Sequence, residues 1–180
     1  AIQVEKSLAM ENPMISAQTY LNKGRALHQL GEMDSVPIYA EKARKLCQSL
    51  PYNSGMVDVD LLYGTFWAER GGDSLQMGIQ ELQQVLRQGT VVNRAKAYHQ
   101  LAQTYLKNEK NDMAEAMLDS MYTLLNQNDS PVYIHLDYQP ILEHYLKSKN
   151  LRKTDQYVRM RLQEHQSFKE KKLNFNLIEA

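Results

Sequence analysis

The sequence predicts an all-α fold of antiparallel helix pairs, about four pairs in a solenoid, followed by an extended C-terminal helix. A marker position recurs at Gly24, Gly64, Ala102 and Leu142, which are 40, 38 and 40 residues apart. A bulky apolar residue follows each marker after three positions and a turn-forming stretch after seven. Elsewhere, apolar residues are spaced by three and four without period-two alternation, as in helices rather than strands. A fixed period of this length is typical of helical-repeat proteins.

The first two pairs are each predicted as two helices joined by a glycine turn. One apolar face of the first pair is formed by Tyr20, Leu21, Gly24 and Leu27, and Gly31 ends that helix. Its second helix is lined by Val36, Pro37, Ala40, Ala43 and Leu46. The second pair repeats the pattern with Val57, Leu61, Gly64 and Trp67, then Gly71 and Gly72, then Leu75, Ile79, Leu82 and Leu86. These spacings place each set on one helical face.

The third pair is the most regular, and the fourth resembles it. The third has Ala95, Tyr98, Leu101, Ala102 and Tyr105 on its first helix, and Met113, Ala114, Met117, Leu118, Met121 and Leu125 on its second. The fourth has Tyr138, Ile141, Leu142 and Tyr145, then Leu151, Val158 and Leu162. Tyr105 and Trp67 are predicted to be mostly buried, since large aromatic side chains on apolar faces drive helix packing.

The ends of the chain are expected to differ from the repeats. Residues 1–13 are predicted to be the end of a preceding helix or repeat, residues 14–165 the repeat domain, and residues 166–180 a helix leading into a following segment. We therefore expect the chain to be part of a longer protein. Phe168, Phe175 and Ile178 form a thin apolar seam on this last helix that would suit pairing with a second copy. The alternative is that the helix only caps the last repeat.

Composition narrows the classes of function. Formal net charge is zero over 180 residues, which argues against general binding of nucleic acid or a membrane surface by this segment. Residues 147–172 carry nine Lys or Arg and three Asp or Glu, so the C-terminal end is locally basic. This run is either a solvated face or a contact for an anionic partner. No stretch of about 18 apolar residues is present, so we expect membrane attachment only through flanking segments.

The repeats resemble the tetratricopeptide repeat, a helix-turn-helix unit with a bulky residue, a small residue, a tyrosine and a turn glycine at set positions. The third pair matches best, with Tyr98, Leu101, Ala102, Tyr105 and Ala114. Lys23 and Asp60 depart from the pattern, where leucine and an aromatic residue are expected, and the period exceeds the usual 34. The resemblance implies a right-handed solenoid with closely packed helices at Gly64. The long, degenerate repeats also look like those that precede a histidine kinase or helix-turn-helix regulator module in Bacteroidetes signalling proteins.

No residue pattern in the sequence favours catalysis, a metal or a cofactor. The five histidines are dispersed, without an HExxH motif or a pair at i,i+4, and Cys47 has no cysteine partner. Cys47 lies in an apolar helical stretch and is predicted to be a buried small hydrophobic residue. The glycines mark turns or close packing, not a phosphate-binding loop. We therefore expect no enzymatic activity, no cofactor and no metal.

If the resemblance holds, the first helix of each pair lines a concave groove. The polar lining predicted on this basis is Gln18, Arg25, His28, Gln29, Asp58, Thr65, Glu69, Lys96, His99, Gln103, Lys107, Gln139 and Glu143, together with Lys147 and the apolar Leu21 and Leu61. Its mixed charges and amides suit an extended peptide or protein segment. The alternative is that these side chains are merely solvated.

The predicted function is a non-enzymatic module that binds a protein or peptide, as the sensing region of a larger signal-transduction protein such as a two-component system. A homodimer through the C-terminal helix is one predicted assembly. The alternatives are a free-standing scaffold or adaptor for protein assembly and, least favoured, an enzyme with its active site in the groove. A periplasmic or extracytoplasmic location is favoured over a cytoplasmic one.

Overall fold

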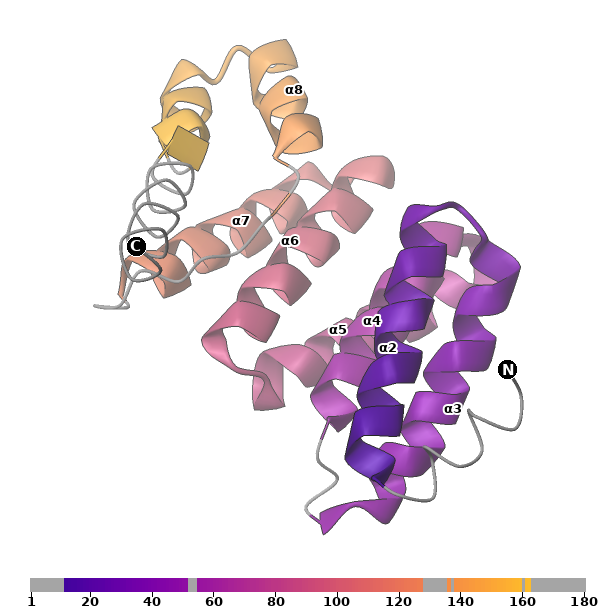
Figure 1. The fold of residues 1–180 in the computed structure, drawn as a ribbon. Coiled ribbons are helices and arrows are strands. Elements are labelled where there is room, and N and C mark those ends of the chain that lie inside the picture. The colour runs from indigo at the N-terminus through magenta and orange to yellow at the C-terminus, as the bar shows by residue number, and fades with distance from the viewer. Residues whose placement is uncertain (1–11, 52–54, 128–135, 137, 160, 163–180) are drawn as a thin grey trace, which may run out of the picture. The chain divides into compact units, whose positions relative to one another are not determined.

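The computed structural model describes residues 12–51, 55–127, 136, 138–159 and 161–162, and this part of the chain contains helices and turns but no strand (Figure 1). The α-helices are α2 (Pro13–Gln29), α3 (Val36–Ser49), α4 (Met56–Arg70), α5 (Leu75–Gln88), α6 (Val91–Lys107), α7 (Asn111–Asn126) and α8 (Gln139–Lys147). Residues 151–159 are also helical, and the short 3-10 helices η1 (Met33–Ser35) and η3 (Gly72–Ser74) precede α3 and α5. The predicted all-α class is confirmed. The segments expected at 1–11 and 166–180 lie outside the described residues.

The turn within each helix pair confirms the repeat that was read from the sequence. A residue with positive φ follows the first helix of each pair, at Gly31, Gly71, Glu109 and Lys149, with φ of 78°, 69°, 56° and 56°. The backbone N–H of the next residue donates to the carbonyl oxygen five residues earlier at 2.9 Å in three of these turns: Glu32 to Leu27, Lys110 to Tyr105 and Asn150 to Tyr145. This bond satisfies a carbonyl that the helix end leaves free. The same turn geometry therefore recurs with the period of the markers.

The chain divides into two compact units, Ala1–Leu101 and Ala102–Ala180. In the N-terminal unit, α2 packs on α3 and α4 packs on α5, while α3 packs on α4 and α2 also contacts α4. The second helix α3 thus lies between its own first helix, α2, and α4 of the next pair, as expected for a helical-repeat stack.

The core of the N-terminal unit is made by the faces that the sequence predicts, with the addition of Phe66 on α4. Phe66 is 1% exposed and forms the large aromatic part of this core. Trp67, predicted to be mostly buried, is only partly buried and packs on the core from its edge, with its ring 4.6 Å from that of Phe66. The predicted apolar face of α4 included Trp67 but not Phe66, because apolar residues occupy several faces of this helix and spacing alone did not identify the most buried one. Cys47 is buried, and Tyr105 in the C-terminal unit is 5% exposed, both as predicted.

Two glycines allow α4 and α5 to pack closely. A Cβ added to Gly64 would lie 2.7 Å from Cγ of Leu82, which confirms this glycine as a position of close approach. A Cβ on Gly78 would lie 2.3 Å from the backbone nitrogen of Ala68 and 2.9 Å from the carbonyl oxygen of Gly64. Gly78 is therefore the tighter position, because there backbone meets backbone.

The second helices share a buried position at intervals of 39 residues: Ala40, Ile79, Leu118 and Tyr157, each less than 9% exposed. In the C-terminal unit, Tyr157 stacks on the buried ring of Tyr145 with centroids 5.6 Å apart. The predicted core residues of this last helix are wrong: Leu151, Val158 and Leu162 are 73%, 39% and 57% exposed. The prediction assigned the aliphatic residues to the core, whereas the buried residue of this helix is Tyr157.

Candidate interaction groove

Two ion pairs join α2 to α4, the first helices of consecutive pairs. Nη2 of Arg25 donates to Oδ1 of Asp58 at 2.7 Å, and Nε2 of His28 donates to Oε2 of Glu69 at 2.8 Å. Arg25 and Asp58 are each about one-third exposed, while His28 and Glu69 are more buried. These four residues were all predicted to line the groove, and the structure brings them together on adjoining helices.

Glu69 extends this polar row to a third first helix. Nε2 of Gln100, on α6 within the N-terminal unit, donates to Oε1 of Glu69 at 3.3 Å. Both carboxylate oxygens of Glu69 are therefore engaged, one by each neighbouring helix. The hydrogen bond from Glu69 raises the pKa of His28, although burial opposes this effect. At mildly acidic pH the row thus contains a protonated imidazole paired with a carboxylate.

The other predicted lining residues of the N-terminal unit are placed differently. Gln18, Gln29 and Lys96 are exposed, Thr65 is half-buried, and His99 is only 6% exposed. The amide of Gln18 donates to Oδ1 of Asn22 one turn later at 2.9 Å. Gln18, Gln29 and Lys96 are therefore the predicted lining residues most accessible to a ligand in this unit.

Leu21 and Leu61 do not line a groove. Leu21 is 1% exposed and Leu61 is 8% exposed, so both belong to the interior and the predicted role as lining is wrong for them. Both fall on the sides of α2 and α4 that pack against neighbouring helices, where apolar area is removed from water.

The predicted residues of the C-terminal unit form a separate set. On α8, the amide of Gln139 donates to Oε1 of Glu143 at 3.0 Å, and both side chains are exposed. Gln103 on α6 is half-buried, and Lys107 and Lys147 are exposed near the ends of α6 and α8. An intrahelical pair of this kind leaves the polar atoms at the surface and contributes only a few tenths of a kcal/mol to the helix.

A cluster of charges that the sequence did not predict lies between α3, α4 and α5. Nη2 of Arg44 on α3 is 2.9 Å from Oε1 of Glu81 on α5 and 3.5 Å from Oδ1 of Asp60 on α4. Its guanidinium carbon also lies 4.3 Å from the centroid of the Tyr63 ring. The Tyr63 hydroxyl is 3.1 Å from Oε2 of Glu41, to which it donates. We call these five residues the junction cluster, because they connect the first helix pair to the second.

Burial sets the protonation of the junction cluster. Asp60 is 7% exposed, and this burial, together with the charge of Glu81 and a hydrogen bond with it, raises the pKa of Asp60 to about 6 despite the opposing effect of Arg44. Burial and the hydrogen bond with Glu41 raise the pKa of Tyr63 to about 12. The sequence did contain a signal: Asp60 occupies the position that holds tyrosine in the other three pairs.

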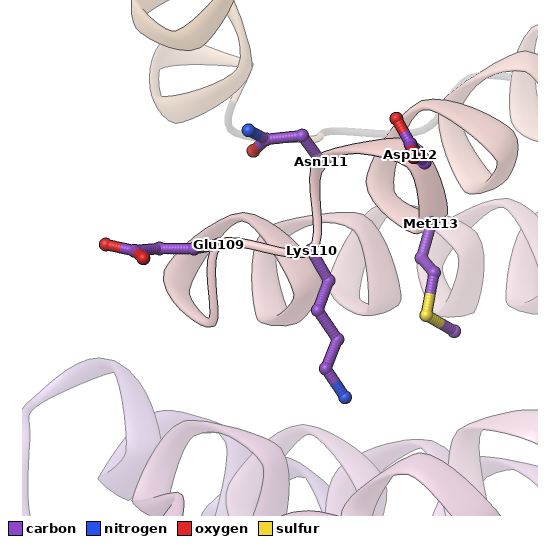
Figure 2. A pocket seen from close by; sticks show the side chains of 5 residues that line it. All are labelled: Glu109, Lys110, Asn111, Asp112 and Met113. Atoms are coloured by element: carbon purple, nitrogen blue, oxygen red, sulfur yellow. The ribbon is translucent and has the colours of Figure 1, made fainter.

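A hollow of about 390 Å³ lies at the turn between α6 and α7, lined by the consecutive residues Glu109, Lys110, Asn111, Asp112 and Met113. Figure 2 shows that these side chains point in different directions, with Glu109 and Lys110 diverging from each other. Five consecutive residues whose side chains do not point toward a common centre form the outer surface of a turn. This hollow is therefore not a candidate active site.

Among the residues that the structure describes, no group of three or more His, Cys, Asp or Glu side chains is arranged to hold a metal ion. Within the same ranges, no helix has the length and apolarity needed to cross a bilayer. Burial raises the pKa of the Cys47 thiol, which disfavours the reactive thiolate.

Comparison with known proteins agrees with the repeat assignment. Residues 95–120 match the family described as tetratricopeptide repeat. The matched stretch runs from α6 into α7, the helix pair in which the sequence pattern is most regular. No curated protein and no solved structure matches the chain. The third helix pair is thus similar to a tetratricopeptide repeat, and the all-helical packing of the described residues is that of a repeat fold of this kind.

Proposed function

We propose that the chain binds an extended segment of a partner protein along its first helices. The observation that supports this proposal is the polar row of Arg25, Asp58, His28, Glu69 and Gln100, which crosses α2, α4 and α6. A row of side chains from successive repeats offers donors and acceptors at intervals along a peptide, while the solenoid supplies a long surface. Repeats of this family are in general non-catalytic interaction modules, so we propose no reaction for the groove.

The proposed setting is a larger signal-transduction protein in which this chain is the sensing region. Its support is the likeness of the long repeats to those of bacterial two-component and helix-turn-helix regulators. In this setting a histidine kinase or regulator module would follow the chain. The repeats would meet their ligand outside the cytoplasm. Dimerisation through the C-terminal helix belongs to the same proposal. A free-standing adaptor is the second candidate, and it requires only the interaction surface.

A peptide selection tests the groove directly. Peptides selected from a random library against the wild-type protein would be titrated against Gln29→Ser and Lys96→Ser, which alter exposed side chains on the first helices α2 and α6, and against the matched controls Lys45→Ser and Gln83→Ser. The controls alter exposed side chains on the second helices α3 and α5. We expect the groove changes to weaken binding by roughly tenfold, as for the loss of one good polar contact of about 1.4 kcal/mol, and the controls to have little effect. Equal losses in all four variants, or losses confined to the controls, would contradict the proposed groove.

A further inference from the structure

The junction cluster has one positive charge beside two carboxyl groups, those of the buried Asp60 and the half-buried Glu81. Arg44 contacts both Asp60 and Glu81 through the same nitrogen, so ionisation of both carboxyl groups leaves one negative charge without a counterion. Two carboxylates that share one site cannot both ionise without mutual repulsion, and burial increases that repulsion. A proton held by Asp60 makes the three groups neutral as a set.

The other charged groups around Asp60 do not remove this imbalance. From α3, Glu41 adds a further carboxylate beside the Tyr63 hydroxyl, and Cys47 adds a neutral thiol. From α4, Asp58 is paired with Arg25 of α2. The neighbouring helices therefore bring no second cation to the two carboxyl groups in the described contacts.

The location of the cluster gives its protonation a structural consequence. Arg44 lies on the second helix of the first pair, and its partners lie on both helices of the second pair. Arg44 also lies over the Tyr63 ring, and that ring stacks on Trp67, with centroids 6.4 Å apart and planes 10° apart. A change in the Arg44 contacts thus acts on the packing between two repeats and reaches the indole of Trp67.

We propose that the junction cluster makes the packing of the first helix pair against the second sensitive to pH. The packing is tighter when Asp60 keeps its proton beside Glu81 and Arg44, and it loosens once Asp60 is ionised. Because α4 also carries Asp58 and Glu69, loosening this junction changes the spacing of the polar row on α2 and α4.

Fluorescence of Trp67, the single tryptophan of the chain, provides the test. The emission of the folded protein would be recorded from pH 4.5 to pH 8 for wild type and for Asp60→Asn, which mimics the protonated carboxyl group. We expect a transition near pH 6 in wild type and its loss in Asp60→Asn. His28→Gln controls for the imidazole on the neighbouring helix and should retain the transition. Glu81→Gln removes the second carboxylate and should move the transition to lower pH; it replaces Asp60→Asn if that variant does not fold.

Urea unfolding at the two ends of this range gives an independent readout. The ratio of the unfolding constants of wild type and Asp60→Asn should rise by roughly tenfold or more from pH 4.5 to pH 8, because wild type alone then holds two ionised carboxylates. Asp73→Asn, on the exposed turn before α5, should show no such change. A wild-type emission that is flat across the range, or a transition that persists in Asp60→Asn, would overturn the proposal.

Discussion

Replacing Gly78 with alanine should destabilise the protein, although alanine is the better helix former. Gly78 lies inside α5, where glycine is less favourable than alanine by about 1 kcal/mol. An added Cβ would nevertheless lie 2.3 Å from the backbone nitrogen of Ala68, whereas ordinary contacts begin at 3.4 Å. The other close atoms, the Cα of Ala68 and the carbonyl oxygen of Gly64, are also backbone and cannot rotate away. We therefore expect α4 and α5 to separate by roughly 1 Å, the difference between these distances.

This separation acts on every contact between the two helices. A gap of 0.5–1 Å forfeits roughly a quarter to a half of the dispersion energy of each affected contact. Inserting one methyl group into a well-packed interior costs about 1–3 kcal/mol, and a site enclosed by backbone belongs at the upper end of that range. After subtracting the gain in helix propensity, we expect a net loss of about 2 kcal/mol.

Urea unfolding monitored by circular dichroism measures this loss, with Gln80→Ala as the control. Gln80 lies on the exposed face of the same helix, so its replacement should change stability by less than about 0.5 kcal/mol. Gly64→Ala adds a second check. Its Cβ would meet the side chain of Leu82, so the substitution should cost less in a Leu82→Ala background than in wild type. If Gly78→Ala is as stable as wild type or more so, the two helices are not in backbone contact and the reasoning is refuted.

Three further tests address other features of the fold, each by chemical denaturation. Glu109→Gly should stabilise the protein by about 1 kcal/mol, because Glu109 holds a left-handed backbone conformation that costs other residues this much; unchanged stability would argue against the positive φ. Phe66→Ala should cost about 3–5 kcal/mol and Trp67→Ala clearly less, since only Phe66 is fully buried; the reverse order would restore the register predicted from the sequence. Tyr157→Ala should likewise cost about 3–5 kcal/mol and Val158→Ala less than about 1 kcal/mol, and equal losses would mean that both side chains are buried.

The repeat and its turns could be predicted from the sequence because they depend on local spacing. Glycine at position 31 and at 71 marks the left-handed turn residue directly, and the 40, 38, 40 spacing leads to Glu109 and Lys149, where residue type gives no such signal. The same reasoning fails in a helix with apolar residues on several faces, and also in a helix with few apolar residues. In α4 it could not separate Phe66 from Trp67, and in the last helix it favoured Val158 over Tyr157.

The sequence predicts which side chains line the candidate groove, but it does not predict which of them form ion pairs with each other. Arg25 and Asp58 are 33 residues apart, and His28 and Glu69 are 41 apart, so their contacts depend on how α2 and α4 pack. The junction cluster has the same origin. The sequence identifies Asp60 as a departure from the repeat, but its contacts with Arg44 and Glu81 depend on how the two neighbouring helices pack against α4.

The ion pairs across α2 and α4 also constrain the kind of ligand that the proposed groove can accept. Arg25 and Asp58 neutralise each other, as do protonated His28 and Glu69, so an approaching peptide meets little net charge there. A ligand cation can reach Asp58 or Glu69 only by displacing the present partner, and partly exposed pairs of this kind are worth about 0–1 kcal/mol. Displacement is therefore energetically possible, but it gains little, because one ion pair replaces another. Hydrogen bonding by exposed amides such as Gln18 and Gln29 breaks no ion pair. It follows that recognition in the N-terminal unit should depend more on the backbone and polar side chains of an extended peptide than on its net charge, and that adding salt should weaken binding only slightly.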